Sequence, residues 1–113
     1  MTIKYDVNKR LYKNVAASSS ETLDYVPADG EQLLVMVLGG DSSSSPETNC
    51  CVLWDQGGGA QEILFSTYAD AKQENVHHLI IGDGVKILRI MLQNDLTESV
   101  LIGAYWQAEI LNG

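Results

Sequence analysis

Several residue types and patterns that would mark the chain for a particular chemistry are scarce or missing. Cysteine occurs only twice, as the neighbours Cys50 and Cys51. Adjacent residues in a strand point to opposite faces, whereas a disulfide needs its two Cβ atoms about 4 Å apart and facing each other. The two thiols are therefore not expected to pair. With no third cysteine the chain has no intrachain disulfide framework, as expected of a protein made in a reducing cytoplasm.

Long hydrophobic runs are also missing. No run approaches the roughly 20 apolar residues that span a membrane. Residues 1–6 lack the apolar core of a cleavable signal peptide. We therefore expect neither a membrane-spanning segment nor export by such a signal.

Basic residues are scarce relative to acidic ones. Seven lysines and arginines stand against 15 acidic residues, which gives a net charge of -8. Nucleic acid and anionic membrane surfaces would repel such a chain, so neither is expected as a partner. Four bases against one acid give residues 1–13 a charge of +3, and three bases against 14 acids give the remainder -11. We interpret residues 1–13 as a basic N-terminal arm or a solvated edge segment.

What the sequence does contain is a series of short strand-like segments. They recur at the spacing of about 8 to 12 residues that is typical of all-β sandwiches and barrels. A chain of 113 residues fits one domain. The sequence therefore predicts a single all-β domain over residues 1–113, a jelly-roll-like antiparallel β-sandwich of about eight strands. The expected strands span residues 11–17, 22–26, 33–38, 50–55, 62–68, 76–81, 85–92 and 100–111.

The segments between these strands have turn-forming composition. Residues 39–49 are polar and aperiodic, so an exposed loop is expected there. Residues 57–59 are three glycines that suit a flexible hairpin connection. The Gly-Asp-Gly link at 82–84 joins two apolar runs and predicts another hairpin. Residues 69–74 are the only helix-friendly piece, long enough for about one turn.

Two runs, 33–38 and 85–92, are apolar at both parities of a strand. A strand with one solvated face should alternate, so such runs need cover on both faces. In a small domain the second cover is expected from another copy of the chain, although the loop 39–49 and the helical turn near Ala71 are alternatives. The sequence therefore predicts a self-assembling homo-oligomer. The residues assigned to its interface are Leu33, Val35, Val37, Val85, Ile87, Arg89 and Met91, with Arg89 able to pair with an acid across it.

The division of residues 33–38 between core and interface stays open. Either Leu34, Met36 and Leu38 face the core, or the opposite parity does. The final segment is unambiguous, because its apolar residues alternate strictly and Trp106 lies among them. The core row expected there is Val100, Ile102, Ala104, Trp106, Ala108 and Ile110, with Gly103 leaving room for a bend or a close neighbour.

No catalytic or metal motif is present. His77 and His78 are adjacent in a strand and cannot easily converge on one metal ion. The serines at 42–45 lack a nucleophile elbow, the glycines at 57–59 lack the lysine of a phosphate loop, and no acidic turn matches a calcium-loop pattern. We expect no enzyme activity, no catalytic residues, no metal and no cofactor.

A carbohydrate-binding module is the alternative function. Tyrosines presented from strands could form a platform for a sugar ring, and Tyr5, Tyr12, Tyr68 and Tyr105 are the candidates. The loops 39–49 and 69–75 would complete the site. Trp54 and Trp106 are expected in the core instead.

Three segments in order resemble the layout of small β-sandwich structural proteins of tailed phages and related viruses. They are residues 25–30 before a long apolar strand, residues 82–90, and residues 101–106 near the end. The resemblance spans residues 20–111 and implies a non-enzymatic virion or tail accessory protein that assembles with itself. It further implies other virion proteins or a host surface glycan as partners, and a location in the virion or the host cytoplasm. It assigns no functional residue.

Overall fold

The computed structural model describes residues 2–42, 47–68 and 70–112. In these residues it contains eight strands, and it has no helix long and apolar enough to cross a membrane. The strands are β1 (Thr2–Val15), β2 (Ser19–Tyr25), β3 (Gln32–Asp41), β4 (Thr48–Asp55), β5 (Gln61–Tyr68), β6 (Ala71–Ile81), β7 (Ile87–Asn94) and β8 (Val100–Asn112).

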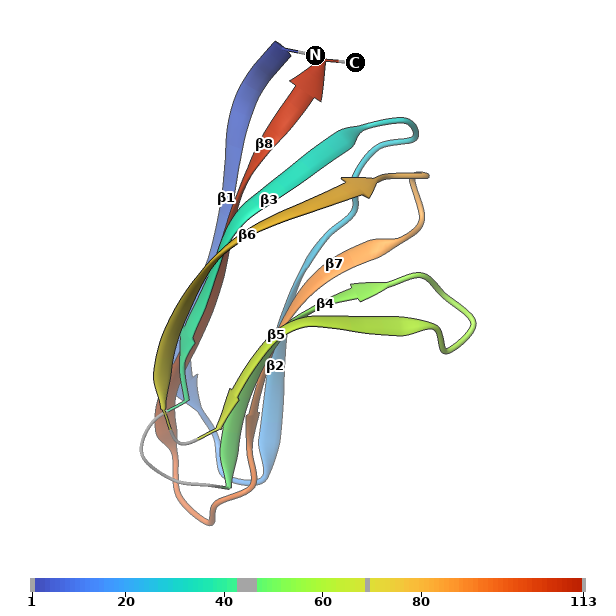
Figure 1. Ribbon diagram of the computed structural model, residues 1–113. Coiled ribbons are helices and arrows are strands. Elements are labelled where there is room, and N and C mark those ends of the chain that lie inside the picture. The colour runs from blue at the N-terminus through green and yellow to red at the C-terminus, as the bar shows by residue number, and fades with distance from the viewer. Residues whose placement is uncertain (1, 43–46, 69, 113) are drawn as a thin grey trace.

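The strands form two packed antiparallel sheets of four (Figure 1). Sheet A has the order β1-β8-β3-β6 and sheet B the order β2-β7-β4-β5. Each strand in the first half of the chain pairs with its counterpart in the second half: β1 with β8, β2 with β7, β3 with β6 and β4 with β5. This nested pairing is a jelly roll, the long double ribbon folded over on itself. The predicted fold class and strand number are confirmed.

The core lies between the sheets and is centred on β8. Its inward row alternates as expected, with Ile102, Ala104 and Trp106 all 0% exposed. Leu88 and Ile90 on β7 belong to the same cluster from the opposite sheet. The strict alternation of β8 follows because its outward face has no second layer over it. The predicted core row and the burial of both tryptophans are confirmed.

The basic segment at the N-terminus is an edge strand that rests on its own chain. β1 lies at the edge of sheet A, paired only with β8. Lys13 forms an ion pair with Glu21 of β2 at 3.0 Å, and the Lys9 ammonium lies 5.8 Å from the centre of the Tyr25 ring. Both lysines therefore link the edges of the two sheets.

The expected hairpin at residues 82–84 is wrong. β6 belongs to sheet A and β7 to sheet B, so this link crosses between the sheets. It bonds instead to the other crossing, between β2 and β3: the Gly30 N–H donates to the Gly82 carbonyl, and the Gly82 N–H donates to the Glu31 carbonyl, both at 2.9 Å. Turn residues specify a change of direction but not the strand that will become the partner.

The expected helical turn at 69–74 is also wrong, because β6 begins at Ala71. Residues of this segment pair with the last residues of β3, where Lys72 lies opposite Gly40 and Ala71 opposite Asp41. Sheet pairing thus overrides a weak local helix preference. The polar run 39–49 is likewise shorter as a loop than expected, since β3 continues to Asp41 and β4 starts at Thr48; residues 43–46 lie outside the described part.

The doubly apolar run in β3 is explained by a β-bulge. The pairing register of β3 with β6 and with β8 shifts between Val35 and Val37. Met36 is the extra residue of the bulge, so the side chains after it face the opposite side from the one that simple alternation predicts. Leu33, Val35 and Leu38 are consequently all 0% exposed in the core. Neither of the two simple parities is realised. Leu33 and Val35, assigned to an interface from the sequence, are core residues of their own chain.

The two thiols are buried on opposite sides of β4. Cys50 belongs to the core between the sheets, whereas Cys51 lies on the outer side of sheet B and is 7% exposed. Burial raises the pKa of Cys50 to about 12, and it also raises the pKa of Cys51. Both groups therefore remain protonated, and unreactive, at neutral pH.

Replacing Leu33 with alanine tests the bulged parity. We expect Leu33→Ala to lower the free energy of unfolding by about 2–5 kcal/mol, because it removes a fully buried side chain. The matched variant Leu34→Ala removes the same atoms from a half-buried, outward position and should cost clearly less. Guanidinium denaturation followed by tryptophan fluorescence measures both. Equal losses, or a larger loss for Leu34→Ala, would contradict the assignment.

Thiol titration tests the burial of the cysteines. At about pH 8 the folded protein should not react with a disulfide reagent such as Ellman's, whereas the denatured chain should release two equivalents. Since the folded pKa of Cys50 lies above the unfolded value of about 8.5, stability should fall as the pH rises from about 9 toward 12. Rapid reaction of either thiol in the native state would show that the strand opens.

Candidate functional site

The outer face of sheet A gathers polar and aromatic side chains from all four of its strands. Because side chains alternate along β1, Lys9 and Leu11 face inward, whereas Asn8, Arg10 and Tyr12 face outward. The register places Arg10 opposite Tyr105 and Tyr12 opposite Gly103. We name this surface the tyrosine face. Its members are Asn8, Arg10 and Tyr12 of β1, Tyr105 and Gln107 of β8, Asp41 of β3 and Gln73 of β6.

Each tyrosine ring on this face covers a glycine of the neighbouring strand. A Cβ atom added at Gly103 would lie 2.0 Å from the Tyr12 ring, and one added at Gly39 would lie 2.4 Å from the Tyr105 ring. The rings can approach the sheet this closely only because these two positions carry no side chain. The two glycines therefore allow the tyrosines to lie over the sheet as a platform.

Polar contacts hold both rings in place. The Arg10 guanidinium lies 4.5 Å from the centre of the Tyr12 ring, a cation–π contact. The Tyr105 hydroxyl hydrogen-bonds to Oε1 of Gln73 on β6. Burial raises the pKa of Tyr12; the positive charge of Arg10 opposes this shift, and the ionised forms of Tyr105 and Asp41 add to it. Tyr12 therefore keeps its proton and can donate a hydrogen bond.

Two hollows open beside the platform along the seam of β1 and β8. The larger, about 420 Å³, is lined by Asn8, Lys9 and Arg10 of β1 and by Tyr105, Trp106 and Gln107 of β8. The smaller, about 200 Å³, is lined by Asn8, Met36, Gln107, Ala108 and Glu109. Because Asn8 and Gln107 border both, the hollows are neighbours. We call them together the β1–β8 groove.

The four tyrosines singled out from the sequence do not form one cluster. Tyr12 and Tyr105 share the tyrosine face. Tyr68 is 63% exposed on β5, opposite Asn49, and belongs to sheet B. The side chain of Tyr5 lies outside the described part. The expected loop contributions at 39–49 and 69–75 become mainly strand residues, of which Asp41 and Gln73 join the face.

The sequence did not single out the amides and the arginine of the groove. Asn8, Arg10, Gln73 and Gln107 are ordinary surface residues until the register of three strand pairs brings them together. One signal did exist, since Gly103 next to Ala104 inside an otherwise apolar strand indicated a bend or a close neighbour. That neighbour is Tyr12.

The seven expected interface residues are divided among four places. Leu33 and Val35 are in the core, and Val37 is half-buried on the outer face of sheet A. Ile87, Arg89 and Met91 lie on the outer face of sheet B, and Val85 lies in the crossing that leads into β7. Val85 is 76% exposed, and Ile63 on the outer face of sheet B is 55% exposed.

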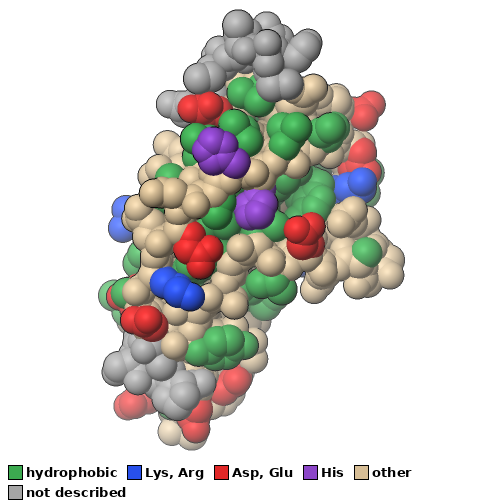
Figure 2. All heavy atoms as spheres, viewed as in Figure 1, with side chains coloured by type: hydrophobic (Ala, Val, Ile, Leu, Met, Phe, Trp, Pro, Cys, Tyr) green, Lys and Arg blue, Asp and Glu red, His purple; other side chains and the backbone are tan. Residues whose placement is uncertain are grey.

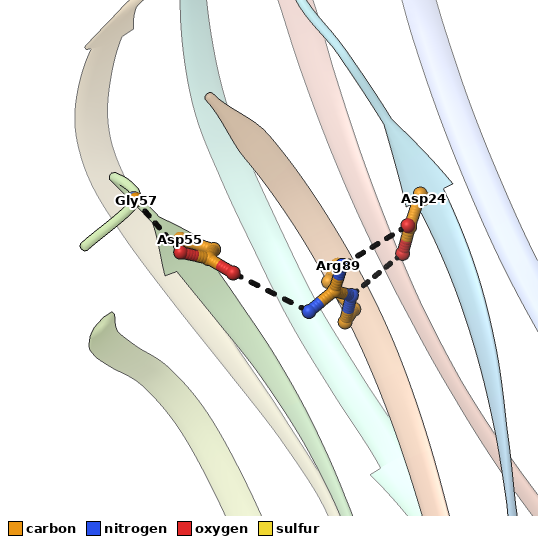
Figure 3. Close-up of polar contacts among 4 residues, drawn as sticks. All are labelled: Asp24, Asp55, Gly57 and Arg89. Carbon is orange, nitrogen blue, oxygen red and sulfur yellow. Dashed lines mark hydrogen bonds and ion pairs between the residues drawn. The ribbon is translucent and has the colours of Figure 1, made fainter. Parts of the chain in front are cut away.

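Arg89 does not reach outward for a partner, because its acids come from its own chain (Figure 3). Its Nε and second guanidinium nitrogen donate to the two carboxylate oxygens of Asp24 on β2 at 2.7 and 3.1 Å. The remaining nitrogen lies 3.4 Å from Asp55 on β4. The hydrogen bonds to Asp24 raise the pKa of Arg89. Arg89 thus links three strands of its own chain and lies opposite the buried Leu53, and its pairing across an interface stays a prediction.

The two histidines of β6 lie apart from each other. No group of three or more potential metal ligands occurs among the described residues. Figure 2 shows the two histidine side chains as separate purple patches. His77 is exposed and His78 half-buried, as expected for neighbours on opposite sides of a strand.

Comparison with known proteins adds the fold and no more. No family model and no curated protein sequence matches the chain. A mitogen from Yersinia pseudotuberculosis has a similar structure, with 10% identity and a TM-score of 0.51 over 95% of this chain and 88% of that chain. The periplasmic g-type lysozyme inhibitor PliG of Aeromonas hydrophila has 14% identity and a TM-score of 0.41 over 95% and 87%. At 10% identity the likeness to the mitogen concerns the fold alone.

Proposed function

We propose that the protein is a non-enzymatic carbohydrate-binding module and that its ligand lies on the tyrosine face. The observation that carries the proposal is the pair of tyrosine rings, each laid over a glycine, beside a hollow walled by amide side chains. A pyranose ring has an apolar face of C–H bonds and an edge of hydroxyls. The platform matches the first and the amides match the second.

The groups in the groove have the donors and acceptors that hydroxyls need. An amide side chain offers both a carbonyl acceptor and N–H donors, and Asn8 and Gln107 each present one. Arg10 adds donors in a planar arrangement. A sugar hydroxyl both donates and accepts hydrogen bonds. A set of side chains that includes donors and acceptors therefore suits it better than a set of donors alone or of acceptors alone.

The face is also held in position before any ligand arrives. Gln73 fixes the hydroxyl of Tyr105, and Arg10 lies against the ring of Tyr12. All these side chains stand on strands rather than on loops. A preorganised site loses less conformational entropy on binding, which supports useful affinity for a polar ligand.

Removal of one ring tests the proposal. In a screen of immobilised glycans followed by calorimetry, Tyr105→Ala should weaken binding by about tenfold or more, because an aromatic contact of about 1.4 kcal/mol is lost. Tyr105→Phe keeps the ring and should retain most of the affinity. Tyr68→Ala, which removes an exposed ring from sheet B, should leave binding unchanged. A flat screen, or equal losses for Tyr68→Ala and Tyr105→Ala, would exclude the proposal.

A second candidate is self-assembly through the outer face of sheet B, as in a viral structural or virion accessory protein. What favours it is that Ile87 and Met91 lie on one face with the exposed Ile63, and that the exposed Val85 comes two residues before Ile87. The guanidinium of Arg89 is already paired there with Asp24 and Asp55 of its own chain, so it would not be buried without a partner if this face were covered. The tyrosine face lies on the other sheet, so the two candidate functions are compatible.

Mass in solution tests the second candidate. If the face mediates assembly, light scattering should find an oligomer, and Val85→Lys combined with Ile63→Lys should shift it toward the monomer, because two ammonium groups would have to be buried. Leu101→Lys introduces one lysine at a comparably exposed apolar position of sheet A and should leave the mass unchanged. A monomeric wild-type protein at high concentration would remove this candidate.

A further inference from the structure

We infer that the tyrosine face binds an extended, uncharged oligosaccharide that lies parallel to β8, rather than a single sugar unit. The inference rests on the proposed carbohydrate-binding function and specifies the class of glycan. It comes from how the groups of the face are arranged along the strand and from where its charges lie.

The elements of the site follow one another along the outward positions of β8. Tyr12 covers Gly103, Tyr105 comes next, Gln107 follows, and Glu109 ends the series. Six residues of strand span about 20 Å. A single sugar ring would occupy only part of this length, whereas a chain of several units can contact all of it.

The two hollows divide this length into neighbouring subsites. In the larger hollow a sugar unit would contact the Tyr105 ring, and in the smaller it would contact the apolar side chain of Met36. Asn8 and Gln107 stand between them, where they can reach hydroxyls of both units. Each subsite thus offers one apolar contact, and the two subsites share the amides between them. This arrangement suits two sugar units that are linked to each other.

The charges around the groove disfavour an anionic glycan. Glu109 lines the smaller hollow, and Asp41 lies opposite Gly103 beside the platform. Two cations line the larger hollow, Lys9 and Arg10, and each already contacts a ring of its own chain: the Lys9 ammonium lies 5.8 Å from the centre of the Tyr25 ring, and the Arg10 guanidinium lies 4.5 Å from the centre of the Tyr12 ring. The whole chain carries -8. A uronate or sulfate would therefore meet repulsion where a hydroxyl would not.

Titration with oligosaccharides of increasing length tests the inference. The probes are cello-, xylo-, manno- and malto-oligosaccharides of about one to six units, with oligogalacturonate as the anionic comparison, and calorimetry with the full chain is the readout. For at least one neutral series the affinity should rise about tenfold or more from the monosaccharide to the longer members and then level off. Oligogalacturonate of equal length should bind more weakly.

Variants toward the two ends of the tyrosine face locate the added affinity. Tyr12→Ala and Met36→Ala should each reduce the gain in affinity from the shortest to the longer members, because each removes one contact of an extended ligand. Glu109→Gln should narrow the difference between neutral and anionic probes, and Tyr68→Ala is the control. Length-independent binding that Tyr105→Ala still weakens would overturn the extended ligand but keep the proposed function. Tighter binding of oligogalacturonate would overturn the uncharged ligand, and no binding by any glycan would remove both.

Discussion

The burial of the inward row of β8 is the constraint on which the rest of the structure depends. Trp106 and Ile102 are fully buried, and together with the rest of that row they pack against β7 and β4 of the opposite sheet. Because β8 is paired on both sides, by β1 and by β3, its position fixes the register of sheet A. The outward residues of β8 are fixed by the same contacts. Core packing thereby positions Gly103, Tyr105 and Gln107 on the surface.

The two sheets present different outer faces to their surroundings. Sheet A carries rings, amides and an arginine, with glycines beneath the rings. Sheet B carries partly exposed aliphatic side chains around the network of Arg89, Asp24 and Asp55. A bidentate ion pair across neighbouring strands adds little stability at the surface but holds their register. A polar recognition face and an apolar face therefore lie back to back on one small domain.

The two strands that are apolar at both parities, β3 and β7, place their side chains differently although their sequence patterns are similar. In β3 the side chains do not alternate between the two faces along the whole strand. The bulge at Met36 brings both Val35 and Leu38 inward, although they are three residues apart. In β7 the alternation holds, so Ile87 and Met91 do face outward as the apolar pattern suggested. The local pattern is similar in the two strands. The difference arises from the partner strands, which the pattern does not contain.

The sequence by itself determined the fold class, the number of strands, the core row of β8 and the absence of a disulfide framework, because alternation, turn spacing and cysteine count are local properties. It also named Tyr12 and Tyr105 as candidates. Only the tertiary structure decided that these two tyrosines share a face with Asn8, Arg10 and Gln73, that residues 82–84 cross between sheets, and that Arg89 pairs within its own chain. The physical reason is that each of these facts depends on which distant strands become neighbours, and that choice is made by the burial of the whole core.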